Sequence, residues 1–156
     1  MKVVVSGGTG FIGSRLLDEL LREGHQVILL SRRPGAAGNR LPGNLEIAPW
    51  DGRLPGPWQE KLEGADGVIN LAGESIAEGR WTAERKARIV ASRVDSTRAI
   101  VQAMAQAKKK PSVLVNASAV GYYGHVPEGK ITESHPKGAG FLADTCARWE
   151  EEARRA

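Results

Sequence analysis

The sequence has few of the features that mark secreted, membrane-bound or metal-binding proteins. Its 156 residues include one cysteine, Cys146, so no internal disulfide can form, and a reducing compartment such as the cytoplasm is expected. No apolar run approaches the roughly 18 residues of a transmembrane helix, and no signal-peptide pattern appears. The three histidines, His25, His125 and His135, lack metal-ligand spacing. These absences predict no bound metal and no membrane contact.

Charge of one sign is also scarce. The formal net charge is +4 at pH 7, and the one cluster of cations is Lys108–Lys110. Cations at a helix C-terminus oppose the negative end of the helix dipole, so we interpret this triplet as a helix end. No nucleic-acid recognition motif accompanies it, and no nucleic-acid partner is expected. The 41% of hydrophobic residues is ordinary for a globular domain with a sizeable core.

Short apolar runs alternate with segments of helical periodicity. Five runs are predicted as buried parallel strands, at residues 3–5, 27–30, 45–48, 67–71 and 113–116. Helices are predicted at 11–23, from Thr82 toward Pro111, and at 141–155, with a short one at 58–62. The segments 32–44, 51–57 and 121–140 are rich in glycine or proline and are predicted as loops. This order predicts an α/β fold, a Rossmann-type doubly wound parallel sheet with strand order 3-2-1-4-5 in a three-layer α/β/α arrangement.

The long helix after Thr82 has apolar residues at alternating spacings of three and four. This spacing predicts one buried stripe along the helix. Its members are Ala87, Val90, Val94, Thr97, Val101 and Met104.

A glycine-rich turn joins the first strand to the first helix. Gly7, Gly10 and Gly13 form a G-x-x-G-x-x-G pattern, with Thr9, Phe11 and Ile12 between them. Glycine permits the tight turn and lets backbone N–H groups approach a pyrophosphate at the helix N-terminus, and the last glycine lets the helix pack closely on the sheet. A glycine turn without a ligand is the alternative. The strand before and the helix after favour dinucleotide binding.

The end of the second strand lacks the acidic residue that usually accepts the ribose 2′-hydroxyl of NAD. It has Ser31, Arg32 and Arg33 instead. A hydroxyl and two guanidinium groups suit a 2′-phosphate, so we expect NADP(H) as the cofactor. The alternative is that these arginines only face solvent.

Small residues follow the fourth strand, at Leu71, Ala72 and Gly73. In a doubly wound sheet, ligands bind beyond the carboxyl ends of the strands, and small side chains there leave room for a ribose and a nicotinamide. A plain strand-to-loop turn is the alternative.

The fifth strand is followed by Ser118, Tyr122 and Tyr123. A hydroxyl and two phenols at this sheet edge are candidate catalytic groups that could polarise a carbonyl or donate a proton. The alternative is that they pack the loop.

Taken together, these segments resemble the epimerase-like atypical short-chain dehydrogenase/reductases, a subgroup of the NAD-dependent epimerase/dehydratase superfamily. The resemblance covers essentially the whole chain. It is carried by SGGTGFIG at 6–13, SRRP at 31–34, APWDG at 48–52, NLAGESI at 70–76, RWT at 80–82, SR at 92–93, SAVGYYG at 118–124 and FLADTCARWE at 141–150.

The resemblance implies a single NADP(H)-binding Rossmann domain over residues 1–156, with Asp51 near the adenine. It also implies that Ser118 is the superfamily's catalytic serine. The cofactor-binding residues expected from the residues and the resemblance together are Gly7, Thr9, Gly10, Phe11, Ile12, Gly13, Ser31, Arg32, Leu71, Ala72, Gly73 and Arg93. The expected activity is that of an NADP-dependent oxidoreductase or epimerase-like enzyme acting on a small molecule.

Two departures from the family pattern bear on this expectation. The superfamily's catalytic Tyr-x-x-x-Lys pair is absent, because residues 141–146 contain neither residue type, and Val126 and Pro127 stand four positions after Tyr122 and Tyr123. A non-catalytic NADP(H)-binding or redox-sensing protein is therefore the alternative. Family members are also roughly twice as long, so we expect this chain to lack a C-terminal substrate-binding part. A sheet ending here would have an uncovered edge and an uncovered apolar face. Association between copies of the chain, as a homo-oligomer, is therefore one of the expectations.

Overall fold

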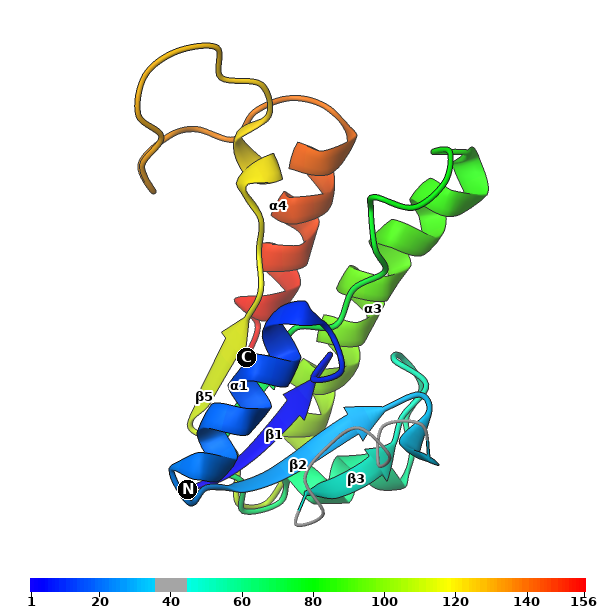
Figure 1. Ribbon diagram of the computed structural model, residues 1–156, viewed down its shortest axis with the longest axis vertical. Coiled ribbons are helices and arrows are strands. Elements are labelled where there is room, and N and C mark those ends of the chain that lie inside the picture. The colour runs from blue at the N-terminus through cyan, green and yellow to red at the C-terminus, as the bar shows by residue number, and fades with distance from the viewer. Residues whose placement is uncertain (36–44) are drawn as a thin grey trace.

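The computed structural model describes residues 1–35 and 45–156, which form one parallel sheet with helices on both faces (Figure 1). The strands are β1 (Lys2–Ser6), β2 (Gln26–Ser31), β3 (Glu46–Pro49), β4 (Gly67–Asn70) and β5 (Val113–Asn116). Their spatial order, β3-β2-β1-β4-β5, confirms the predicted one. The predicted loop at 32–44 lies, from residue 36 on, outside the described residues.

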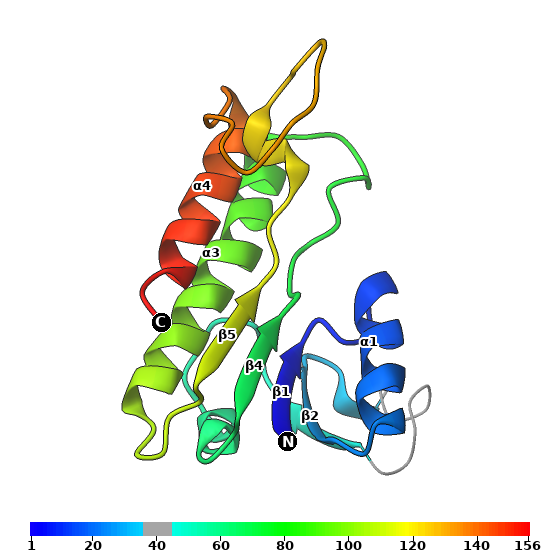
Figure 2. The same ribbon diagram turned by 90° about the vertical axis from the view of Figure 1, so that its left-hand side faces the viewer.

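The helices divide into two layers. They are α1 (Phe11–Arg22), the 3-10 helix η1 (Pro57–Leu62), α3 (Ala83–Gln106), the 3-10 turn η2 (Val120–Tyr123) and α4 (Phe141–Ala153). Figure 2 shows α1 on one side of the strands and α3 with α4 on the other, which confirms the three layers. The turn η2, between the end of β5 and α4, overlaps the start of the segment 121–140 that was predicted as loop.

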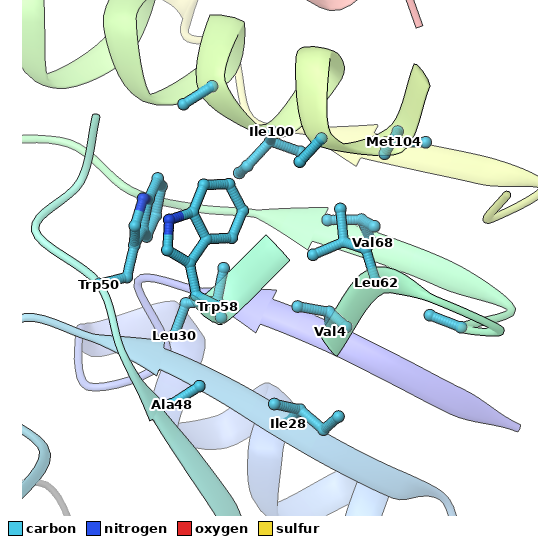
Figure 3. Packing of buried hydrophobic residues seen from close by; sticks show 13 residues of the cluster. Val4, Ile28, Leu30, Ala48, Trp50, Trp58, Leu62, Val68, Ile100 and Met104 are labelled. Carbon is cyan, nitrogen blue, oxygen red and sulfur yellow. The ribbon is translucent and has the colours of Figure 1, made fainter. Parts of the chain in front are cut away.

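Each face of the sheet has its own hydrophobic core. Val3 and Val5 of β1 pack with Leu17 of α1 on one face, while Val4 packs with Ile100 of α3 on the other (Figure 3). Because successive side chains of a strand point to opposite faces, a strand buried on both sides is apolar at every position. This explains why β1 and β2 appear in the sequence as continuous apolar runs.

Two tryptophans close the core beneath the loop that follows β3. The rings of Trp50 and Trp58 lie 5.1 Å apart between centroids, tilted by 47° (Figure 3). Trp58 Nε1 donates to the carbonyl oxygen of Leu54 at 2.9 Å. This bond fixes the loop to the start of η1.

The predicted stripe on α3 is wrong at its N-terminal end. Ala87 is exposed and Val90 is only partly buried, because this part of α3 extends past the ends of the strands (Figures 1 and 2). Farther along, the sheet and α4 pack against two sides of the helix, so the buried surface is wider than one stripe. The buried residues of α3 are Ile89, Val94, Ser96, Thr97, Ala99, Ile100, Val101, Ala103 and Met104.

The lysine triplet, interpreted as a helix end, lies directly after the C-terminus of α3 and its C-cap Ala107. The helix ends at Gln106. The carboxylate of Glu63 accepts the backbone N–H groups of Lys108 at 2.9 Å and Lys109 at 2.8 Å. These bonds replace the helical ones and turn the chain toward β5.

The strand β5 is the last of the sheet as described, with β4 as its neighbour. Val113 and Val115 are 47% and 52% exposed. Their register with Gly67 and Ile69 of β4 places them on the α1 side of the sheet, beyond the reach of α1. Among residues 1–35 and 45–156, no second strand pairs with β5 and no helix covers these two valines. Among the described residues, no helix is long and apolar enough to cross a membrane.

Candidate functional site

A cavity of about 680 Å³ opens at the carboxyl ends of the strands, where β2 and β4 flank β1. Strand order reverses at this point, and in open α/β sheets the resulting crevice is where ligands bind. Its walls come from the glycine turn, the ends of β2, β3 and β4, and one face of α3. The lining residues are Gly7, Thr9, Gly10, Leu30, Ser31, Arg32, Arg33, Trp50, Asp51, Gly52, Arg53, Leu71, Ala72, Gly73, Glu74, Arg88, Ala91, Ser92 and Ser96.

The glycine turn requires glycine for two reasons. Gly7 has φ +73°, and a Cβ atom there would stand 2.6 Å from the carbonyl carbon and oxygen of Leu71. A Cβ on Gly13 would stand 2.3 Å from the carbonyl oxygen of Gly7. The N–H of Gly10 donates to that same oxygen at 3.0 Å, which closes the turn. The turn therefore packs directly against the end of β4 and the start of α1.

The start of α1 offers backbone donors rather than side chains. Gly10 is the N-cap and provides no capping side chain. The first N–H groups of a helix have no partner within it, so they can bind an anion. Phe11 and Ile12, expected to bind cofactor, are 93% and 68% exposed, and neither lines the cavity. Gly13 is buried against the turn.

Ser31 and Arg32 line the cavity at the end of β2, as the sequence predicts for a 2′-phosphate site. Arg33 lies beside them, and its N–H donates to Ser31 Oγ at 3.2 Å. The sequence reasoning missed Arg53, which lines the same cavity from the loop after β3. The signal was its place two residues after Asp51, in a segment that carries part of the family pattern.

Asp51 holds its own loop in shape. Its Oδ1 accepts the N–H of Leu54 at 2.8 Å and that of Arg53 at 2.9 Å. These bonds, that of Leu54 first, lower the pKa of Asp51 below its ordinary value. The carboxylate thus fixes the turn that carries Arg53 into the cavity.

The end of β4 contributes Leu71, Ala72 and Gly73, and all three line the cavity as expected. The N–H of Leu71 donates to the carbonyl oxygen of Ser6 at 3.1 Å, and that of Ala72 to Asn70 Oδ1 at 3.3 Å. Because Ala72 and Gly73 are small, they leave space in the cavity beside the end of β4.

A buried polar network, which the sequence reasoning missed, fixes the strand ends beneath the cavity. Asn70 accepts from Ser6 Oγ at 2.5 Å and donates to Asn116 Oδ1 at 2.7 Å and Thr97 Oγ1 at 2.9 Å. Trp149 Nε1 donates to the same threonine oxygen at 2.9 Å. The network joins β1, β4 and β5 to α3 and α4. Its one sequence signal was an asparagine near the end of each of two predicted strands, Asn70 in 67–71 and Asn116 in 113–116.

Arg93, expected as a cofactor contact, lies behind the loop after β4 and outside the lining of the cavity. Its guanidinium donates to the carbonyl oxygens of Glu74 and Ile89 at 3.1 Å and stands 5.3 Å from the ring of Trp149. A Cβ on Gly73 would lie 3.1 Å from its Cζ. Burial lowers the pKa of Arg93, opposed by Cys146 and Glu74. Arg93 therefore lies between the loop that follows β4 and the helix α4.

The carboxylate of Glu74 holds the same loop from the cavity side. It pairs with Arg85 at 3.5 Å and with Arg88 at 3.4 Å, and the Glu74 N–H donates to Ser92 Oγ at 3.0 Å. Arg88 and Ser92 line the cavity, although the sequence reasoning named neither as a cofactor contact. The loop is therefore fixed to α3 at several points.

The three expected catalytic residues are not brought into this cavity. Ser118 Oγ donates to Glu150 Oε1 of α4 at 2.5 Å. The rings of Tyr122 and Tyr123 contact each other edge to face, 5.2 Å apart between centroids. On α4, Cys146 is buried, and burial raises the pKa of its thiol. In residues 1–35 and 45–156, no three His, Cys, Asp or Glu side chains come together as a metal site.

Comparison with known proteins places these features in a family. A model of the NAD dependent epimerase/dehydratase family matches residues 3–140. The chain belongs to this family. It is 39% identical over 155 residues to the epimerase family protein YfhF of Bacillus subtilis, covering 99% of this chain and 50% of that protein. Human epimerase family protein SDR39U1 is 33% identical, covering 99% of this chain and 49% of that protein.

Solved structures agree with the family assignment. The crystal structure of human SDR39U1 (isoform 2) with NADPH superimposes with a TM-score of 0.80 at 32% identity, covering 99% of this chain and 49% of that one. A nucleoside-diphosphate sugar epimerase from Corynebacterium glutamicum gives 0.76 at 29% identity, covering 100% of this chain and 31% of that one. The chain spans about half the length of the curated relatives it matches.

Proposed function

We propose that residues 1–156 form an NADP(H)-binding Rossmann domain of an epimerase/dehydratase-like oxidoreductase of the short-chain dehydrogenase/reductase superfamily. The observation that carries the proposal is the cavity of about 680 Å³, which joins the glycine turn at one wall to Ser31 and Arg32 at another. Human SDR39U1, similar over 99% of this chain, has been solved with NADPH.

The residues present fit a dinucleotide. The close approach of Gly7 to Leu71 leaves no room for a side chain at that position, and the backbone N–H groups at the start of α1 can bind a pyrophosphate. Ser31 and Arg32 supply a hydroxyl and a guanidinium for a 2′-phosphate. Ala72 and Gly73 leave space beside β4 for the nicotinamide end.

The cofactor would supply hydride transfer to or from a small-molecule substrate. Ser118, Tyr122 and Tyr123 are the candidates in this chain for moving a proton to or from that substrate. These three candidates are supported by the chemistry of their side chains and by their position after β5, because none of them lines the cavity. The free, buried Cys146 supports a reducing compartment such as the cytoplasm.

A non-catalytic NADP(H)-binding or redox-sensing protein is the second candidate, and a specific observation favours it. The side chain of Ser118 is engaged by Glu150, and α4 offers neither tyrosine nor lysine. Absorbance of NADPH, followed with a library of carbonyl compounds, separates the two. Consumption that falls in Ser118→Ala or Tyr122→Phe supports the enzyme, whereas tight binding without consumption supports the sensor.

The cofactor assignment is tested by titrating the chain with NADPH and, separately, with NADH in a calorimeter. NADPH is expected to bind at least about tenfold more tightly, a difference of about 1.4 kcal/mol. Arg32→Ala should weaken NADPH and leave NADH nearly unchanged, because only NADPH carries the 2′-phosphate. Equal affinities of the unchanged chain for both cofactors would refute the 2′-phosphate assignment. Binding of neither would refute the cofactor site.

A further inference from the structure

The loops that follow β2 and β3 leave the sheet side by side. Ser31 of β2 is in register with Pro49 of β3, and the N–H of Trp50 donates to the carbonyl oxygen of Ser31 at 3.0 Å. Arg32 follows directly on one strand and the Asp51 turn on the other. Neighbouring strands are about 4.8 Å apart, so the glycine turn after β1 lies roughly 10 Å from the end of β3. The loop that carries Arg53 is therefore closer to the two arginines that follow β2 than to the pyrophosphate position.

The loop carrying Arg53 is fixed in place by the fold. Asp51 Oδ1 accepts the N–H groups of Arg53 and Leu54, and Trp58 Nε1 donates to the Leu54 carbonyl. Gly52 has φ +98°, a conformation that side chains rarely adopt. A loop held at both ends presents Arg53 with little ordering left to occur on binding.

The charge in this part of the cavity is unbalanced. Arg32, Arg33 and Arg53 all line it, together with the carboxylate of Asp51. One oxygen of that carboxylate is already engaged by two backbone donors. The ion pairs formed among residues 1–35 and 45–156 involve other cations than these three arginines. Three arginines thus line a space suited to a dianionic group.

We propose that Arg53 is a specificity-determining residue that binds the 2′-phosphate of the adenosine ribose from the β3 side, opposite Arg32. The inference rests on the proposed function and adds a second, separate strand to the recognition of NADP(H) over NAD(H). A phosphate monoester has three peripheral oxygens, so two guanidinium groups from different loops can bind it without competing.

The probes for this inference are adenosine 2′,5′-bisphosphate and adenosine 5′-monophosphate, which differ only in the 2′-phosphate. In calorimetric titrations, Arg53→Ala should weaken the bisphosphate by about tenfold, as expected for loss of a hydrogen bond to a charged group. The monophosphate should change by less than about twofold, because the pyrophosphate end of the site is untouched. Arg15→Ala, an exposed position on α1, is the matched control for net charge and should leave both affinities unchanged.

The outcomes separate this inference from the proposed function. If both the unchanged chain and the Arg53→Ala variant prefer the bisphosphate to the same degree, the role of Arg53 is refuted and the cofactor assignment stays intact. An equal loss for both probes would also refute it, since Arg53 would then act on the shared part of the ligand. Failure of the unchanged chain to bind either probe or NADPH would refute both. Loss of the bisphosphate preference in Arg53→Ala, with Arg15→Ala unaffected, supports the inference.

Discussion

Gly7 and Gly24 have nearly the same backbone conformation but very different surroundings. Their φ angles are +73° and +76°. A Cβ on Gly7 would collide with the backbone of Leu71, whereas a Cβ on Gly24 would meet no atom within 4 Å. Gly24 illustrates the need for conformational freedom alone, whereas Gly7 adds the need for close approach of two backbone segments.

Alanine at each position is expected to give different losses of stability. Gly24→Ala should cost about 1 kcal/mol of unfolding free energy, from backbone strain alone. Gly7→Ala should cost about 2–4 kcal/mol, because displacement of the Leu71 backbone adds to the strain. Urea denaturation measures both values. NADPH affinity should fall only in Gly7→Ala, and equal losses of stability in the two variants would contradict the close approach.

At the scale of elements, α3 connects the sheet, α4 and the cavity. Its buried side contacts the sheet through Ile100 and Met104, and Thr97 receives the indole N–H of Trp149. Ser92 and Ser96 of the same helix line the cavity. A change in the packing of α4 can therefore reach the cofactor site through one rigid helix and the loop that Arg93 holds.

Arg93 is predicted to act as a positioning residue at this junction. Arg93→Lys replaces the planar guanidinium group that donates to the carbonyl oxygens of Glu74 and Ile89. The unfolding free energy should therefore fall by about 1–3 kcal/mol. NADPH affinity should fall less than in Arg32→Ala, because Arg32 lines the cavity and Arg93 does not.

The matched control is Arg98→Lys on the same helix. Arg98 pairs with Asp95 at 3.1 Å and with Glu152 at 2.7 Å, at a half-exposed position where lysine keeps the charge. Its stability loss should stay within about 0.5 kcal/mol. A strong loss of NADPH affinity in Arg93→Lys with unchanged stability would instead identify Arg93 as a direct cofactor contact.

At the scale of the whole molecule, the ligand site lies between the two halves of the sheet, and binding should stabilise both together. NADPH at 100 times its dissociation constant is expected to add about 2.7 kcal/mol. For a domain of this size, this corresponds to a rise in Tm of roughly 5–10 °C. Thermal unfolding followed by tryptophan fluorescence measures it. NADH at the same concentration should give a smaller shift, and equal shifts would contradict the preference for NADP(H).

The uncovered face at β5 is the other whole-molecule feature. Val113 and Val115 lie on the α1 side of the sheet without a covering helix among the described residues. Apolar surface beside an open strand edge favours association.

The sequence by itself determined the fold, because its signals are local. A parallel strand covered on both faces is apolar throughout, and a helix repeats every 3.6 residues, so both can be recognised in a short window. The glycine turn was equally readable, since each glycine there meets a backbone constraint within its own βα unit. For these reasons the strand order, the layers and the cavity-lining positions at Gly7, Ser31 and Leu71 were predicted.

Only the tertiary structure decided which side chains share one space. Hydrogen bonds of the Asn70 network join residues up to 64 positions apart, and Arg53 and Arg32 line one cavity because β2 and β3 pair. The same cause accounts for the error on α3. Ala87 has the right spacing for burial but extends past the sheet, and Glu63 ends α3 by binding Lys108 and Lys109 across the fold. Burial, charge balance and the direction of an arginine depend on neighbours that are distant in the chain, and those neighbours are specified only once the sheet has formed.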